Sequence, residues 1–240
     1  MQKDQKNKKE WKSIVELFEA MNESLDYCVL RNAEDITRDF SSEIHGDIDI
    51  LVADREKAKQ VLRLKKVYSE SYRTIYEAIV AGKSLRIDIK YVGDNYYCEK
   101  WEIALLKSSH KILHDNIHIK VPSLKCLYYS LLYHAYLQKN IIANDYPSKL
   151  LKYADGAGLL YKNDASYLIA QLEEYMKEND FKYVFPNDIN MPINWQNLRY
   201  FTNYKKIRFW EWYRPNIVFF RFNRIIAKII KKAKKYLRIN

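Results

Sequence analysis

Acidic residues carry the clearest chemical signal in this sequence. The segment DIDILV places Asp47 and Asp49 two positions apart in an apolar run. Because side chains alternate between the faces of a strand, a strand here points both carboxylates to one face and sends Ile48 and Ile50 into the core. Aspartate is depleted in strands, so its occurrence twice in three positions indicates a function. Carboxylates on a rigid element suit a hard divalent cation, Mg²⁺ or Mn²⁺.

A second segment, SLRIDIKYV at 84–92, repeats this alternation. Its apolar positions would point inward, which leaves Arg86, Asp88 and Lys90 on the other face. Alone, an acid between two bases is typical of a solvated ladder of opposite charges. After a strand with Asp-x-Asp, Asp88 is better interpreted as a third metal ligand on a neighbouring strand, with Arg86 and Lys90 as substrate contacts. Two metal ions bridged by such carboxylates would stabilise the attacking and leaving oxygens of a phosphoryl transfer.

The surrounding elements follow from hydrophobic periodicity. Early in the chain we expect a helix at 11–21, strands at 27–30 and 47–52, and a helix at 55–64. Residues 66–92 form strands with a turn at Ala81-Gly82, and helices follow at 122–139, 147–162 and 164–178, before a loop at 179–200. These elements divide into a core at 1–118, a helical module at 119–182, and a loop with a basic aromatic tail at 183–240.

Composition limits the classes of protein. Of the 240 residues, 48% are hydrophobic and 15% aromatic, which predicts a folded chain, and the scarcity of glycine and proline argues against a β-sandwich. The last 40 residues hold twelve Lys/Arg and one acid, so the totals of 41 and 30 leave 29 of each sign in the first 200. A neutral body is not expected to follow a nucleic-acid backbone.

The order of the motifs resembles the DNA polymerase β-like nucleotidyltransferase superfamily. Within it, YCVLRN, HGDIDILV and IKVPSLKCLYYSLLYHAYLQK are similar to bacterial nucleotidyltransferase-like proteins associated with surface-polysaccharide assembly, over residues 20 to 160. The resemblance implies an α+β fold with a mixed sheet flanked by helices, then a helical module and a basic amphipathic C-terminal helix. It also implies that Asp47 and Asp49 bind both metals, and that Asp88 completes the catalytic metal site and accepts the proton of the attacking hydroxyl.

One departure from that superfamily concerns the phosphate-binding position. Its members usually carry Gly-Gly or Gly-Ser after the first strand, whereas this chain carries Arg31-Asn32. Arg31 would then contact phosphate through its guanidinium, and a nucleotide-activated alditol or choline is an alternative donor to a free nucleoside triphosphate. His45 and Gly46 directly precede the Asp-x-Asp strand and are further candidates for substrate binding.

Histidine and cysteine give weaker signals. On a helix, His110, His114 and His118 would lie on one face, but their segment is more typical of a turn into a strand, so no zinc site is expected. His134 is interpreted as a core histidine in an apolar, tyrosine-rich helix. The three cysteines lack zinc-type spacing and are expected to be reduced thiols.

The tail from 217 to 240 separates into a cationic and an apolar side at helical spacing. The apolar side carries Phe222, Ile225, Ile226 and Ile229 among others, and an interfacial membrane helix needs this pattern. A helix docked on the body and a nucleic-acid contact are the alternatives. We expect contact with an anionic membrane surface through Arg221, Arg224, Lys228, Lys231, Lys232 and Lys235.

Taken together, these features predict a transferase of the EC 2.7 class that moves a nucleotidyl or phospho-substituent from a nucleotide or nucleotide-activated donor onto a glycan or lipid-linked glycan. No signal peptide or membrane span is expected, which favours the cytoplasm and the inner face of its membrane. Nucleotidyl transfer to a protein, RNA or small molecule is the alternative enzyme. A catalytically inactive nucleic-acid-binding module is the non-enzymatic alternative.

Overall fold

The computed structural model describes residues 10–33, 36, 47–69, 74–188, 191–212, 222, 225–226 and 229. The chain divides into two compact units, Met1–Tyr200 and Phe201–Asn240, and each is described by itself. The boundaries expected at residues 118 and 182 both fall inside the first unit.

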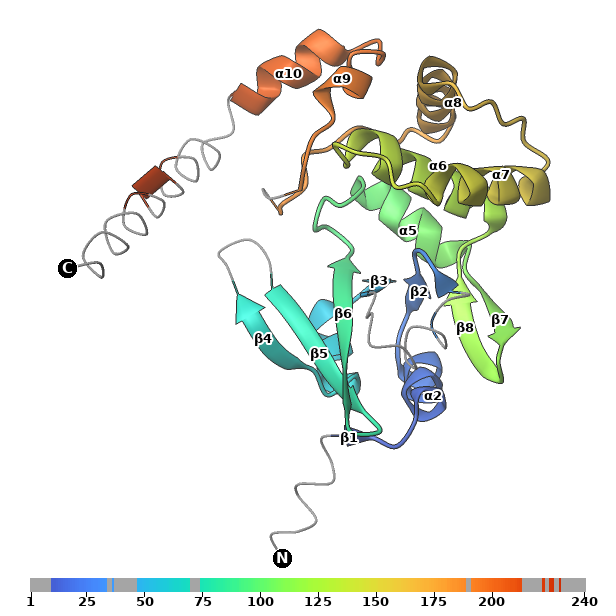
Figure 1. Ribbon diagram of the computed structural model, residues 1–240, viewed down its shortest axis with the longest axis vertical. Helices are drawn as coiled ribbons and strands as arrows, with labels where there is room; N and C mark the ends of the chain where they lie inside the picture. The colour runs from blue at the N-terminus through green and yellow to red at the C-terminus, as the bar shows by residue number, and fades with distance from the viewer. Residues whose placement is uncertain are drawn as a thin grey trace, which may run out of the picture. The chain divides into compact units, whose positions relative to one another are not determined.

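A mixed sheet forms the centre of the first unit (Figure 1). Its strands are β1 (Glu10–Trp11), β2 (Tyr27–Val29), β3 (Ile48–Val52), β4 (Lys65–Ser69), β5 (Thr74–Val80) and β6 (Lys83–Tyr91). The order is β1-β5-β6-β3-β2, and β4 also pairs with β5. The central strands β3 and β6 run parallel, whereas β2 is antiparallel to β3 and β5 is antiparallel to β6. The strands expected around both aspartate motifs are therefore confirmed.

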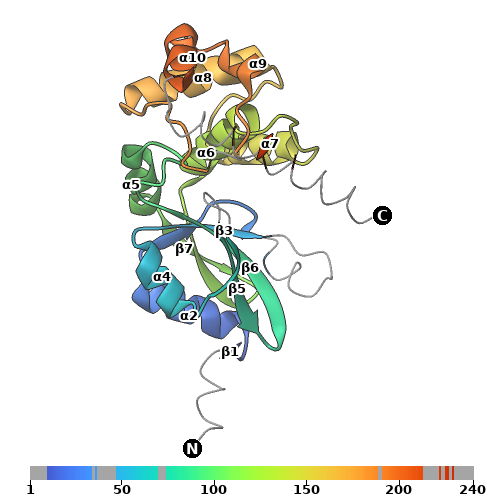
Figure 2. The ribbon, with the colours of Figure 1, turned by 90° about the vertical axis from the view of Figure 1, so that its left-hand side faces the viewer.

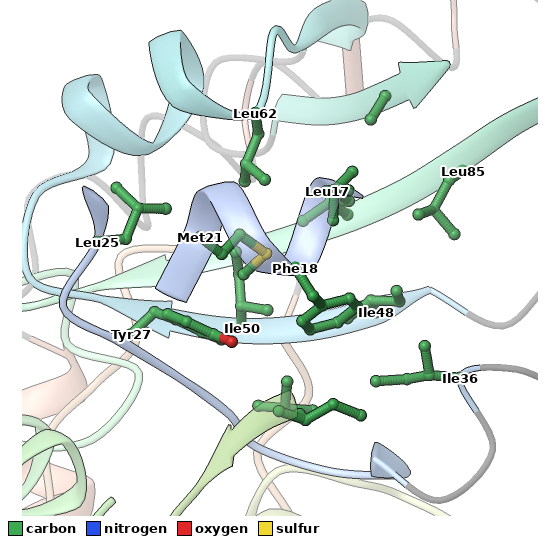
Figure 3. Packing of buried hydrophobic residues seen from close by; sticks show 14 of the residues in the cluster. Leu17, Phe18, Met21, Leu25, Tyr27, Ile36, Ile48, Ile50, Leu62 and Leu85 are labelled. Atoms are coloured by element: carbon green, nitrogen blue, oxygen red, sulfur yellow. The ribbon is translucent and has the colours of Figure 1, made fainter. Parts of the chain in front are cut away.

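Helix α2 (Ile14–Ser24) covers one face of this sheet. It begins at Ile14 rather than at the expected Trp11, because Trp11 pairs with Val80 of β5 and the Oγ of Ser13 accepts a hydrogen bond from the Glu16 amide at 3.2 Å. Phe18 and Met21 point from the helix toward β3 (Figure 3). This packing fixes which side of β3 and β6 is apolar.

Helix α4 (Arg55–Val61) lies on the same side of the sheet as α2 (Figure 2). Asp54 caps its N-terminus by accepting from the Lys57 amide at 3.0 Å. The helix is shorter than the expected 55–64, because Arg63 adopts a left-handed backbone with φ of 54°. Such a residue ends a helix.

A β-hairpin, β7 (His110–His114) with β8 (Ile117–Val121), follows the sheet. Its two turn residues, Asp115 and Asn116, both have positive φ, of 45° and 63°, as a tight two-residue hairpin turn requires. This confirms that the histidine-rich segment is not a helix. Helix α5 (Glu99–Lys107), which was not expected from the sequence pattern, precedes the hairpin. The helix is short and buries Glu102 beside its apolar residues, which blurs the amphipathic pattern.

Four further helices lie in the described part of the first unit, and α6 is the central one. They are α6 (Leu124–Leu137), α7 (Tyr146–Ala157), α8 (Ala165–Glu178) and α9 (Trp195–Leu198). Ser123 caps α6, and the helix is buried from Leu127 to Leu137. The arrowhead of β6 points toward α5 and α6 (Figure 1). The ends of the central strands therefore face this helical layer, which has an aromatic core around Trp101, Tyr133 and Phe181.

The second unit contains α10 (Tyr204–Trp212). Within the described part of the chain, no helix is both long and apolar enough to cross a membrane. The expected α+β class, a mixed sheet flanked by helices, is confirmed, and the arrangement is consistent with the nucleotidyltransferase fold that the resemblance implies.

Candidate active site

Asp49 and Asp88 are register partners on the two central parallel strands. The neighbouring pairs, Ile48 with Ile87 and Ile50 with Ile89, bury their side chains in the core beneath α2. Because side chains alternate along a strand, both carboxylates lie on the opposite face of the sheet. Two acids therefore stand side by side on neighbouring strands, which is costly unless positive charge offsets them.

Asp47 is exposed and directly precedes β3. It lines a small cavity of about 10 Å³ together with Arg86 and Asp88, which places it on the Asp88 side of the site. Within the described ranges, no three His, Cys, Asp or Glu side chains are gathered closely enough to hold a metal ion as they stand. The three predicted ligands thus share one region of the sheet without converging on one point.

Arg31 neutralises Asp49. Its Nη2 lies 2.8 Å from one carboxylate oxygen, and its Nε donates to the other at 3.2 Å. The backbone explains the pairing, because the amide of Leu30 donates to the carbonyl of Asp49 at 3.0 Å and so brings the next residue alongside. The Arg31 side chain is only 8% exposed. Burial alone would lower the pKa of Arg31, but Asp49 and Tyr96 hold it above its ordinary value.

Lys90 neutralises Asp88 from two positions along the same strand. Its Nζ lies 2.9 Å and 3.1 Å from the two carboxylate oxygens, and its side chain is 10% exposed. The solvated charge ladder considered for this strand is therefore wrong for Lys90. It does describe Arg86, which is 55% exposed and pairs with Glu77 of β5 at 3.6 Å.

Tyr96 joins the two cations. Its hydroxyl accepts a hydrogen bond from Nη1 of Arg31 at 2.8 Å, and its ring centroid lies 4.9 Å from Nζ of Lys90. Burial raises the pKa of Tyr96 well above its ordinary value, so the phenol stays neutral. The sequence carries no signal for this residue, because nothing in the spacing of the 21 tyrosines distinguishes it.

The hydroxyl of Tyr96 also bonds to Nδ1 of His134 at 2.7 Å, in a direction that depends on the imidazole tautomer. Gln138 lies 3.1 Å from the same nitrogen and donates from Nε2 to the Tyr96 carbonyl at 2.7 Å. Burial, followed by the charge of Arg31, lowers the pKa of His134 well below its ordinary value, so the ring is neutral. The prediction that His134 is a core histidine is confirmed. It contacts the site through the hydroxyl of Tyr96.

A pair of carboxyl groups, those of Asp94 and Glu102, lies near Lys90. Asp94 accepts from the amides of Tyr91 and Tyr96, while Glu102 of α5 accepts from the amides of Gly93 and Tyr97. The two carboxyls are hydrogen-bonded to each other, and burial raises the pKa of Glu102 to about 8. Asp94, Asp88 and Lys90 line a polar cavity of about 90 Å³ together with residues 186–188.

The remaining predicted residues lie apart from this centre or outside the described residues. Asn32 takes a left-handed backbone, with φ of 58°, and its Oδ1 accepts from Nζ of Lys149 at 2.6 Å. His45 and Gly46 lie outside the residues that the structure describes. The same holds for the six predicted membrane contacts, Arg221, Arg224, Lys228, Lys231, Lys232 and Lys235.

Two of the solved structures are similar to this chain over 68% of its length. No family model and no curated protein matches the chain. Among solved structures, it is similar to an antigenic nucleotidyltransferase-like protein from Paracoccidioides brasiliensis, with a TM-score of 0.38 and 12% identity over 68% of this chain and 84% of that one. It is also similar to the antibiotic-resistance factor ANT(2'')-Ia, with a TM-score of 0.40 and 10% identity over 68% and 89%. At these TM-scores neither likeness bears on what the chain does.

Proposed function

We propose that this chain is a divalent-metal-dependent transferase of nucleotidyl or phospho-substituents. The observation that supports it is the register of Asp49 with Asp88 on two parallel strands. Acids placed side by side on a rigid sheet, with buried cations beside them, suit a substrate that carries phosphate and a metal. A purely structural charge cluster would not require two neighbouring carboxylates in strand positions.

The donor set fits Mg²⁺ or Mn²⁺ in kind, because Asp47, Asp49 and Asp88 offer only carboxylate oxygens. These residues would hold the metal. When bound, it would polarise the phosphoryl oxygens and offset the negative charge that develops during transfer. Metal binding requires Arg31 and Lys90 to share or give up the oxygens that they now contact.

The residues of the chain have distinct roles in this proposal. Arg31 and Lys90 bind the phosphate oxygens of the donor, since both cations already stand beside the carboxylates. Asp88 accepts the proton of the attacking hydroxyl at a carboxylate oxygen. The hydroxyl oxygen bonds to phosphorus, and the leaving group departs with the electron pair of the bond that breaks. Tyr96 holds Arg31 in place through its 2.8 Å hydrogen bond.

Calorimetry tests this proposal with a panel of nucleotides and CDP-linked donors, with and without Mn²⁺. We expect metal-dependent binding to the wild type and its loss in Asp47→Asn/Asp88→Asn. Asp47 is exposed, so the single variant Asp47→Asn should fold and still bind metal more weakly. Asp155→Asn, an exposed change on α7, is the matched control and should bind as the wild type does. Metal-independent binding, or none to any donor, would refute the proposal.

For the acceptor, we propose a glycan or lipid-linked glycan at an anionic membrane surface. Phe222, Ile225, Ile226 and Ile229 recur at helical spacing and are 61%, 57%, 38% and 61% exposed. An exposed apolar stripe among basic residues favours binding at a lipid interface. This would place the enzyme on the inner face of the cytoplasmic membrane.

Sedimentation with vesicles tests this part separately. The wild type should sediment with phosphatidylserine-containing vesicles and not with neutral ones. Lys232→Glu/Lys235→Glu should lose that binding, whereas the same charge change at the exposed Lys65 and Lys66 should not. Equal sedimentation of all three proteins would exclude the tail as the contact. It would then favour transfer to a soluble protein, RNA or small molecule.

A further inference from the structure

A third cavity adjoins the carboxylate site on the side of Arg31. It has a volume of about 310 Å³ and lies between the end of β2, the β7–β8 hairpin and the helices α6 and α7. We call it the hairpin cavity. Its apolar lining includes Val29, Ile112, Val121, Leu124, Leu127 and Tyr153.

The hairpin cavity has the size of a small-molecule site and not of a gap in core packing. Native cores contain few voids larger than a water molecule, which occupies about 30 Å³ of the liquid. Small-molecule sites begin at about 300 Å³ and are mostly apolar, with a few polar groups. His110 and Lys152 line the cavity and are exposed, and Leu124 is 41% exposed, so its wall reaches the surface.

Charge indicates the kind of ligand that would bind there. The lining contains no Asp or Glu, and besides Arg31, whose charge Asp49 offsets, its polar groups include Lys152, His110 and His114. An apolar chamber with an exposed lysine at its edge complements a molecule that has an apolar body and an anionic group. Arg31 connects the two sites, because it lines the hairpin cavity and holds Asp49 through both carboxylate oxygens.

We propose that the hairpin cavity binds an anionic amphiphile with a compact apolar body, close to Asp49. Where the proposed transferase function holds, the amphiphile is the anionic, lipid-linked form of the proposed glycan acceptor, and that assignment rests on the proposed function. The phosphate groups of the donor would then occupy the polar cavity of Asp88, Lys90 and Asp94. Binding of the amphiphile itself does not depend on catalysis.

Gly156 of α7 offers a way to close the cavity without touching the carboxylates. A Cβ at this position would lie 2.6 Å from Cδ1 of Leu124, which is too close for any real contact. Because Leu124 lines the hairpin cavity, Gly156→Ala should displace that side chain and change the shape of the cavity. Leu124→Trp should fill it directly with an indole ring. Leu151 is 45% exposed on α7 and does not line the cavity, so Leu151→Trp is the matched control.

The probe is 8-anilinonaphthalene-1-sulfonate, an aromatic anion, titrated by calorimetry into the full chain. We expect one molar equivalent to bind, with affinity about tenfold weaker in Leu124→Trp and reduced in Gly156→Ala, but unchanged in Leu151→Trp. The neutral analogue N-phenyl-1-naphthylamine should bind more weakly than the anion. Equal binding of the anion to all four proteins, or no binding, would overturn the proposal, and a preference for the neutral analogue would overturn its anionic part.

Two further titrations separate this inference from the proposed function. Metal-dependent donor binding should survive in Leu124→Trp, and its loss would mean that the cavity holds part of the donor, which would overturn the acceptor assignment. The probe should still bind to Asp47→Asn/Asp88→Asn. If the wild type binds the probe but no donor, the proposed transferase function fails while the ligand site stands.

Discussion

The hydroxyl of Tyr96 lies 2.8 Å from Nη1 of Arg31 and so ties the carboxylate site to the helical layer. Through this hydroxyl the guanidinium that neutralises Asp49 is connected to His134 of α6. A cation held by groups from two layers cannot move freely. The orientation of Arg31 is therefore set by the packing of the helices as well as by the sheet.

Removal of this hydroxyl should weaken both the fold and the site. In Tyr96→Phe, a buried charged donor and a buried imidazole each lose a partner, which should lower the free energy of unfolding by about 1–3 kcal/mol. Urea denaturation followed by circular dichroism measures it. Tyr200→Phe removes a hydroxyl that is hydrogen-bonded to Arg199 on an exposed side chain, and should change stability by less than about 0.5 kcal/mol. An unchanged free energy of unfolding in Tyr96→Phe would contradict the proposal that this hydroxyl stabilises Arg31.

The Arg31–Asp49 pair should show strong coupling in a double-mutant cycle. Asp49→Asn leaves a buried guanidinium without its counter-charge and should cost about 3–5 kcal/mol of stability. Arg31→Met/Asp49→Asn removes both charges and should recover part of that loss, because no unpaired ion remains. Chemical denaturation of the four proteins gives the coupling energy. Strictly additive losses would mean that the two side chains act independently.

Lys90 should compete with a metal ion for the oxygens of Asp88. Because Nζ lies within 3.1 Å of both oxygens, Lys90→Met should strengthen Mn²⁺ binding several-fold while weakening binding of the phosphate donor. Electron paramagnetic resonance of free Mn²⁺ measures the first effect, and calorimetry measures the second. Arg86→Met is the control, because Arg86 lies on the same strand face but pairs with Glu77. It should change Mn²⁺ binding and donor binding less than Lys90→Met does. Weaker Mn²⁺ binding in Lys90→Met would disprove the competition.

The pair of Asp94 and Glu102 should make stability depend on pH. Burial raises the pKa of Glu102 from 4.5 to about 8, so the folded protein binds more protons than the unfolded chain between these values. The free energy of unfolding should therefore fall as pH rises from about 4.5 to about 8. Glu102→Gln, which stays neutral and can still donate to Asp94, should flatten this slope. Thermal unfolding measured across this pH range tests the prediction. Glu99→Gln is the control, because Glu99 is exposed and its loss should leave the dependence of stability on pH unchanged.

Local pattern was sufficient for several parts of the fold. The alternation in DIDILV and LRIDIKY correctly predicted that Ile48, Ile50, Ile87 and Ile89 enter the core, because strand geometry alone places neighbours on opposite faces. The turn at Ala81-Gly82, the helix over 124–137 and the burial of His134 also follow from short-range signals. Helix α5 was missed because the buried Glu102 interrupts its apolar face.

The composition of the site depended on long-range pairing instead. The sequence by itself supplied Asp47, Asp49 and Asp88 as candidates, but it could not show that Asp49 and Asp88 are register partners. Nor could it show that Arg31 and Lys90 are buried against them, since each cation is solvated in an isolated strand. Strand register and the closure of the helical layer over the sheet determine these contacts. Both arise from packing between segments far apart in the chain, for which spacing along the sequence carries no signal.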